Sequence, residues 1–204
     1  MTAANQILEA HRHAARLTRR QALRSLGHVA AGLSCVGLWA ARAAIGADGG
    51  KTGRGQLADE IERVMWDKVL AAWYPRCLDR ERGGFHEKFS RDWTRGSTDS
   101  KFLVYQARQT WTAAAVALAY PQRQDEYLPY ARHGLRFLAD KMWDAPRGGF
   151  FDRTDAAGRP MMDKMPWKQL YSYAFGIYAA AAVSEATGDR DALDLGKSAF
   201  QWLD

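Results

Sequence analysis

The chain has 204 residues, 47% of them hydrophobic, which suits a single globular domain. The net charge is +6, but residues 1–47 hold six Arg and one acid, so almost all of the excess lies there. The rest is nearly neutral and has no basic block with interleaved aromatic residues, which argues against a nucleic-acid-binding protein. Aromatic residues make up 12%, and either a well-filled core or rings that stack on sugars would account for them.

Residues 1–47 resemble a twin-arginine export signal. The motif T-R-R-x-x-L-R begins at Thr18, and an apolar stretch over residues 26–41 follows it. Small residues then predict cleavage near Ala43 or Ala47. We therefore expect a periplasmic or otherwise exported protein.

A membrane anchor and a lipoprotein are the alternatives for this leader. The apolar stretch contains His28 and is shorter than the roughly 20 residues that span a bilayer, so no stable anchor is expected. Cys35 would carry the lipid, but Gly32 stands where a Leu-like residue is expected.

Beyond the leader only Cys77 remains, which excludes an internal disulfide, and no cluster has metal-ligand spacing. No metal is expected.

Residues 48–55 are interpreted as a polar, glycine-rich linker. From Gln56 to about Tyr74, apolar residues recur at intervals of three and four, which predicts an amphipathic helix that ends at Pro75. Residues 77–100 contain a glycine pair and alternating apolar residues, and they are interpreted as a short hairpin or an extended loop.

Two kinds of helix follow in alternation. Lys101–Tyr120 and Lys168–Ala186 are rich in Ala and apolar on nearly all sides, which predicts buried helices. Tyr127–Trp143 between them is amphipathic, and a turn at Asp155 and Gly158 closes the loop after it. The segment T-G-D-R-D-A is expected to cap a third amphipathic helix.

The motif D-x-x-R-G-G-F occurs twice, at Asp79 and at Asp144, which are 65 residues apart. The repeating unit is an amphipathic helix, a Gly-Gly-Phe loop and a buried helix. Amphipathic helices would form an outer layer and apolar helices an inner one, and such hairpins closed in a ring make an (α/α) barrel. Six units of this length need about 390 residues, so the chain corresponds to about two and a half.

Several segments, read in order, resemble the N-acylglucosamine 2-epimerase family of sugar epimerases and isomerases. They are Y-P-R-C-L-D-R-E-R-G-G-F, Q-A-R-Q-T-W, D-A-P-R-G-G-F-F-D-R and K-Q-L-Y-S-Y-A-F-G, and the likeness covers residues 56–204. The resemblance implies an all-α (α/α)6 barrel with a sugar pocket. It also implies proton transfer at C2 through an enediolate, with a small-molecule sugar as substrate and neither metal nor cofactor. The oligomeric state stays open.

By this resemblance, Arg108 is the catalytic candidate that binds oxygen atoms of the substrate. It is the only charged residue between Phe102 and Tyr120, and a guanidinium suits a developing oxyanion. The alternative is a buried Arg paired with Asp92 or Asp99. Tyr171 matches a residue that contacts sugar hydroxyls, with a core aromatic as its alternative.

Three further residues are candidates for substrate binding. Trp111 and Trp167 could stack on a sugar or fill the core. His86 could face the pocket, although a solvated loop residue is the simpler interpretation. Lys168 is expected to form a salt bridge, and His133 is interpreted as a surface residue among arginines.

The resemblance places the acid–base histidines of the reaction beyond Asp204, so we expect the chain to be catalytically incomplete by itself. An (α/α)6 glycoside hydrolase is one alternative, and its two carboxylates would come from Asp92, Asp99 or Asp152. A non-catalytic carbohydrate-binding or interaction protein is the other.

Overall fold

The structure is a computed structural model that describes residues 53–97, 100–163 and 167–203. All of these belong to one compact unit that comprises Gly50–Asp204. The predicted export signal lies outside the described residues, and so does Asp99. Within the described part, no helix has the length and apolar character required to cross a bilayer.

The first predicted helix is present and consists of three consecutive segments. α4 (Gly53–Val64) continues into the π-helical η2 (Met65–Leu70) and then into α5 (Ala71–Trp73). It begins three residues before Gln56, within the segment predicted as linker, and it ends before Pro75 as expected. Much of its apolar face is exposed, including Leu57 and Ile61, and α4 itself buries no residue.

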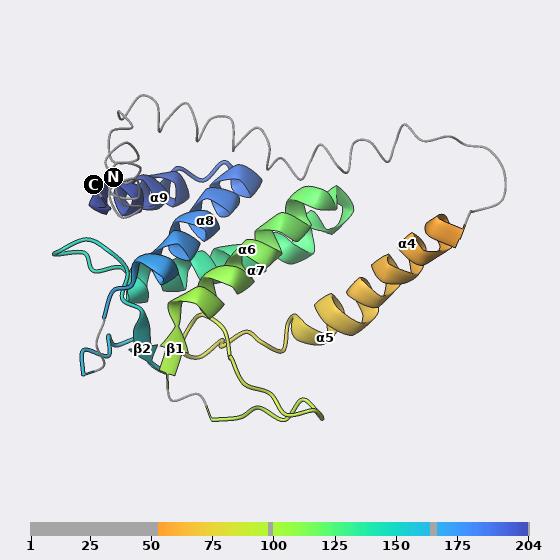
Figure 1. Cartoon of the computed structure of the whole chain (residues 1–204), viewed down its shortest axis with the longest axis horizontal. Coiled ribbons are helices and arrows are strands. Elements are labelled where there is room, and N and C mark those ends of the chain that lie inside the picture. The colour runs from red at the N-terminus through yellow and green to blue at the C-terminus, as the bar shows by residue number, and fades with distance from the viewer. Residues whose placement is uncertain (1–52, 98–99, 164–166, 204) are drawn as a thin grey trace, which may run out of the picture. The chain divides into compact units, whose positions relative to one another are not determined.

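The alternation of buried and amphipathic helices is confirmed. In chain order the elements are α6 (Leu103–Ala119), η3 (Pro121–Arg123), α7 (Gln124–Phe137), η4 (Leu138–Met142), α8 (Leu170–Thr187) and α9 (Arg190–Trp202). α6 packs against both α7 and α8, and α8 packs against α9 (Figure 1). The inner pair is therefore α6 and α8, and their small Ala side chains allow this close packing.

A short antiparallel pair of strands precedes the inner helices. β1 (Ser100–Phe102) pairs with β2 (Arg153–Asp155), so the loops of the two repeats are joined to each other (Figure 1). Lys101 is therefore in a strand, where a helix had been predicted. The second inner helix likewise begins at Leu170, two residues after the predicted start at Lys168. The pairing joins residues about fifty positions apart, which local periodicity does not reveal.

The two Gly-Gly-Phe loops have the same conformation. All four glycines have positive φ, 83° and 68° at Gly83 and Gly84 and 70° and 87° in the second pair, where side chains are disfavoured. Each loop then buries its Phe completely, Phe85 in one core cluster and Phe150 in the other. The sequence repeat is thus a repeated anchor between an outer and an inner helix.

A lysine closes each loop in the same way, fully buried in the first repeat and partly buried in the second. The Lys101 ammonium lies 2.8 Å from Asp79 Oδ2 and also donates to the carbonyl of Gly83. In the second repeat, Lys168 Nζ lies 2.8 Å from Asp144 Oδ2 and donates to Gly148, which confirms the predicted salt bridge. We call these two pairs the loop clamps.

Each ammonium of the loop clamps also lies over an aromatic ring of the following outer helix. Lys101 Nζ is 4.7 Å from the ring centroid of Phe137 on α7, and Lys168 Nζ is 5.2 Å from that of Trp202 on α9. These rings occupy equivalent positions, 65 residues apart. Each clamp therefore ties one hairpin to the next.

Candidate functional site on the inner helices

Two carboxylates hold the starts of the inner helices. Glu87 Oε1 accepts hydrogen bonds from the backbone N–H of Phe102 at 2.6 Å and from Gln106 Nε2 at 3.0 Å. Burial raises the pKa of Glu87. Asp152, 65 residues later, accepts a hydrogen bond from Ser172 and another from Gln169 Nε2 at 3.3 Å. These bonds orient the first turns of α6 and α8.

Both inner helices expose one face. On α8 the exposed positions include Tyr171, Ala174, Tyr178 and Ala181, spaced at three and four, which places them on one side of the helix. The neighbouring helix α6 exposes Arg108 and leaves Trp111 half-buried one turn later. We call the set Arg108, Trp111, Tyr171, Phe175 and Tyr178 the α6–α8 surface.

Aromatic contacts across the helix pair organise this surface. Trp111 stacks on Tyr178 with ring centroids 5.0 Å apart and an interplanar angle of 23°. The Arg108 guanidinium carbon lies 6.0 Å from the ring centroid of Phe175, and the ring of Tyr171 meets Phe175 edge-on at 5.3 Å. A cation and four aromatic rings therefore share one exposed face. A cation suits a negatively charged sugar oxygen, and aromatic rings suit the sugar ring.

The alternative interpretation of Arg108, a buried residue paired with Asp92 or Asp99, is wrong about its burial. Its side chain is exposed, and within the described residues it has no carboxylate partner at salt-bridge distance. Asp92, one of the two proposed partners, is exposed and bonded to Ser90 and Thr94. The physical reason is that Arg108 faces away from the outer helices, on the open side of α6. Its donors are available to a ligand.

Sequence reasoning missed Phe175 and Tyr178. Both follow Tyr171 on α8, at four and seven residues, so the helical period alone places them on the same face. The signal was present, but the almost continuous apolar pattern of this helix did not show which face would stay open.

Trp167 lies in the loop before α8 with 36% of its surface exposed, and its backbone carbonyl accepts the N–H of Asp152 at 2.6 Å.

The interpretation of His86 as a solvated loop residue is wrong, because only 7% of its surface is exposed. Arg95 Nη1 lies 3.1 Å from Nε2, and a guanidinium can only donate, so Nε2 accepts and the ring proton sits on Nδ1. Nδ1 lies 3.9 Å from Asp79 Oδ2. Burial and the nearby Arg95 lower the pKa of His86, although Asp79 opposes this.

His133 is not the surface residue that its arginine neighbours suggested. It is half-buried, packs edge-on against Phe85 at 5.6 Å, and donates from Nε2 to the carbonyl of Gly84 at 2.7 Å. Burial is the main cause that lowers its pKa. It therefore holds α7 against the first Gly-Gly-Phe loop.

The buried His86 and the half-buried His133 predict an acid-sensitive fold. Both pKa values are lowered on folding, so below about pH 6.5 the unfolded chain binds more protons and stability falls as the pH decreases. We expect a lower urea midpoint at about pH 5.5 than at about pH 7.5. His133→Gln, whose amide can still donate to Gly84, should reduce this difference. Equal midpoints at the two pH values would contradict the prediction.

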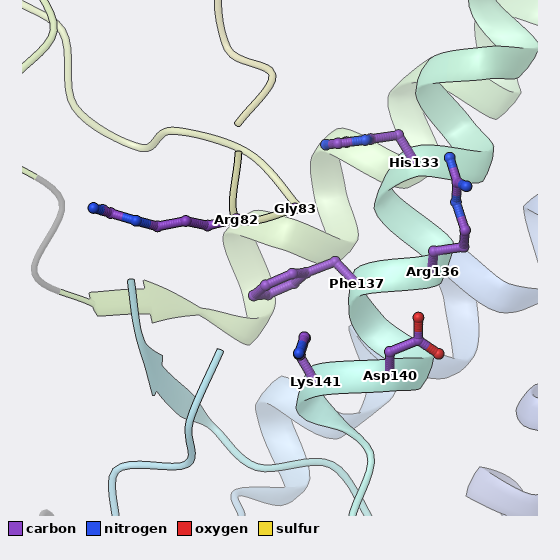
Figure 2. Close-up of a pocket in the computed structure, with 7 residues that line it drawn as sticks. All are labelled: Arg82, Gly83, His133, Arg136, Phe137, Asp140 and Lys141. Carbon is purple, nitrogen blue, oxygen red and sulfur yellow. The ribbon is translucent and has the colours of Figure 1, made fainter. Parts of the chain in front are cut away.

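A separate pocket of about 280 Å³ lies on the outer side, between α7 and the first Gly-Gly-Phe loop. It is lined by Arg82, Gly83, His133, Arg136, Phe137, Asp140 and Lys141. Figure 2 shows Phe137 pointing from α7 toward the loop, whereas the side chain of Arg82 extends away from the helix. Since its cations do not converge, we assign the candidate site to the α6–α8 surface.

Metal binding has no evident place in the described residues. No group of three His, Cys, Asp or Glu side chains lies there with an arrangement that could hold an ion. Cys77 is a free, fully buried thiol, and burial raises its pKa to about 12. Such a thiol is unreactive.

Alternating outer and inner helices joined by Gly-Gly-Phe loops define a protein built from the helical hairpins of an (α/α)6 barrel. Residues 83–204 match the family described as N-acylglucosamine 2-epimerase (GlcNAc 2-epimerase), and the chain belongs to this family.

Relatives with known activities agree with this assignment. The cellobiose 2-epimerase of Bacteroides fragilis is 29% identical over 137 residues, which are 67% of this chain and 34% of the relative. The structure of cellobiose 2-epimerase from Spirochaeta thermophila has 34% identity and a TM-score of 0.65, over 72% of this chain and 35% of that one. A D-mannose isomerase shares the fold at 22% identity, with a TM-score of 0.58, over 76% of this chain and 36% of that one. The chain thus spans about a third of the length of its relatives.

Proposed function

We propose that this chain forms part of a carbohydrate 2-epimerase or aldose–ketose isomerase and that the α6–α8 surface binds its sugar. The observation that carries the proposal is the exposed Arg108, without a carboxylate partner among the described residues, beside four aromatic rings in a member of this family. The names of the relatives support both reactions, since they include cellobiose 2-epimerases and a mannose isomerase.

The two reactions share their first step. A base removes the proton at C2 of an open-chain aldose, next to the C1 carbonyl, and the electron pair moves to give an enediolate. Return of the proton to the opposite face of C2 produces the epimer, and its return at C1 produces the ketose. The negative charge resides on the oxygens at C1 and C2, so the protein needs donors at those atoms.

Arg108 suits this task because the guanidinium stays charged and offers donors in a fixed fork that can reach two neighbouring oxygens. The phenol of Tyr171, which is 67% exposed, can hydrogen-bond a sugar hydroxyl. Trp111 and Tyr178 provide apolar ring surface for the carbons of the sugar. Nε2 of His86 faces Arg95 and Nε2 of His133 faces the carbonyl of Gly84, and both rings lie in the first Gly-Gly-Phe loop region, so we propose that other residues carry the proton.

Asp152, one of the carboxylates considered for the glycoside hydrolase alternative, is buried and already hydrogen-bonded. Asp152 is 3% exposed, and both of its oxygens accept hydrogen bonds from the start of α8. Its counterpart Glu87 has the same role at α6. Neither carboxylate is placed to protonate a glycosidic oxygen over the α6–α8 surface. A non-catalytic sugar-binding protein remains as an outcome of the experiment below.

Export of the protein is part of the same proposal. It rests on the twin-arginine-like motif and the apolar stretch of residues 1–47. Replacement of Arg19 and Arg20 by Lys should retain the protein in the cytoplasm of a bacterial host, which cell fractionation would show.

Substitution of Arg108 should weaken sugar binding by about 10- to 100-fold, the effect of losing hydrogen bonds to a charged group. The experiment titrates the chain with mannose, N-acetylglucosamine and cellobiose and follows tryptophan fluorescence for the parent, Arg108→Met and Arg132→Met. Arg132, which is exposed on α7, is the matched control. Equal affinities of the two variants would contradict the assignment of the site.

Exchange of the C2 proton in deuterated water then tests whether the chain by itself carries out the proton transfer. Deuterium at C2 of a bound sugar would show that the chain carries out the proton transfer and would overturn the expectation of incompleteness. Sugar binding without exchange would agree with that expectation and with a binding protein.

A further inference from the structure

Trp93 has a backbone conformation that a bulky residue rarely adopts. Its φ is 66°, and among the described residues it is the only one other than glycine with positive φ. The left-handed region costs an ordinary residue about 1–2 kcal/mol, a cost that Gly would avoid. Such outliers persist where the surroundings hold them, and they are frequent at functional sites.

The surrounding loop holds Trp93 at the tip of a tight turn. Its N–H donates to the carbonyl of Ser90 at 3.0 Å, while the N–H of Ser90 donates to the carbonyl of Thr94 at 2.9 Å. Asp92 Oδ1 accepts the N–H of Thr94 at 3.2 Å. The bridge between Phe89 and Arg95 closes the turn beneath it. These bonds fix the backbone of the turn but make no use of the indole ring.

The indole is held in place and still partly exposed. It meets Trp73 edge-on at 5.6 Å and Phe89 at 5.9 Å, and the guanidinium of Arg76 lies 5.3 Å from its centroid. Contacts of this kind contribute about 0.5–1.5 kcal/mol each, enough to offset the backbone strain. Even so, 37% of Trp93 faces solvent. The exposed part of the ring is accessible to a ligand.

A row of aromatic rings runs from Trp93 to the first turn of α6. Trp73 lies 5.6 Å from Trp93 and 6.5 Å from Tyr105, measured between ring centroids. Tyr105 is on α6, three residues before Arg108 and therefore on the same side of the helix. The Trp93 loop is thus linked, through Trp73 and Tyr105, to the side of α6 that carries Arg108.

We infer that Trp93 is a sugar-stacking residue that binds a second sugar unit, which makes the site selective for a disaccharide over a monosaccharide. The inference rests on the proposed function. Two ring-to-ring steps and one helical turn separate Trp93 from Arg108, so a monosaccharide held at Arg108 does not reach the indole. A disaccharide whose reducing unit lies at Arg108 extends its other ring toward the exposed indole, and a fixed aromatic face binds a pyranose at little entropic cost.

The test compares sugars and uses two variants of Trp93. Trp93→Gly removes the ring and at the same time relieves the positive φ, so the turn is preserved, and Trp93→Phe keeps an aromatic face. We expect Trp93→Gly to weaken cellobiose binding by about 3- to 10-fold, the worth of one aromatic contact, and to leave mannose binding unchanged. Trp93→Phe should lie between the parent and Trp93→Gly. Thermal unfolding followed by circular dichroism checks that both variants remain folded.

Arg108→Met, measured alongside, separates failure of the inference from failure of the proposed function. If Trp93→Gly binds cellobiose like the parent, or weakens both sugars equally, while Arg108→Met weakens both, the inference is wrong and the proposed function stands. If Arg108→Met also has no effect, the sugar site is wrong and the inference falls with it.

Discussion

Lys101→Met is expected to lower the free energy of unfolding by about 3–5 kcal/mol, the cost of leaving a buried charge without its partner. Lys101 has no exposed surface, and its ammonium lies 2.8 Å from Asp79 Oδ2. Burial opposes the charge of Asp79, but the hydrogen bonds from Lys101 and from the N–H of Arg82 hold its pKa below the ordinary value. Without Lys101 the carboxylate is desolvated with no cation in contact, and the carbonyl of Gly83 loses its donor.

The second loop clamp provides a graded comparison. Lys168 contacts Asp144 at the same distance, but 13% of its side chain is exposed, so Lys168→Met should destabilise the protein less than Lys101→Met. Lys197→Met on the exposed side of α9 is the matched control and should change stability by less than about 0.5 kcal/mol. Urea unfolding followed by circular dichroism measures all three. A Lys101→Met variant as stable as Lys197→Met would show that the clamp does not support the fold.

Three glycine-to-alanine substitutions in helices should differ in sign. A Cβ on Gly134 would lie 2.7 Å from the ring of Phe85 and would overlap the hydroxyl of Thr110, and a Cβ on Gly176 would lie 2.6 Å from the ring of Phe150. Overpacking of this kind costs about 1–3 kcal/mol, whereas Ala gains at most about 1 kcal/mol over Gly in a helix. We expect net destabilisation at both positions.

Gly196 is the control, because a Cβ there meets only the methyl group of Ala180 at 3.5 Å, an ordinary contact. Gly196→Ala should therefore raise stability by about 0.5–1 kcal/mol through helix propensity alone. Thermal and urea unfolding of the three variants measures the contrast. If Gly134→Ala and Gly176→Ala stabilise the protein as Gly196→Ala does, the Phe anchors are not packed as described.

The 65-residue repeat extends beyond the D-x-x-R-G-G-F motif. The offset of 65 residues that relates Asp79 to Asp144 also relates Phe85 to Phe150, Glu87 to Asp152 and Phe137 to Trp202. In each pair the two members have corresponding places: the Phe anchors lie in the two core clusters, the carboxylates accept hydrogen bonds from the start of the next inner helix, and the rings lie by the clamp lysines. The offset alone could therefore have paired Glu87 with Asp152.

The alternation of outer and inner helices and the turns at the glycine pairs were readable from the sequence, because periodicity and turn chemistry are local properties. The family came from the resemblance of several motifs in order, and the family match confirms it. The tertiary structure decided the rest. It buried His86, bonded His133 to the first Gly-Gly-Phe loop, paired β1 with β2, and left Arg108 on the open side of α6. The physical reason is that burial and charge pairing depend on which neighbours lie opposite a residue. For an almost uniformly apolar helix such as α6 or α8, only packing against α7 and α9 determines which face remains free for a ligand.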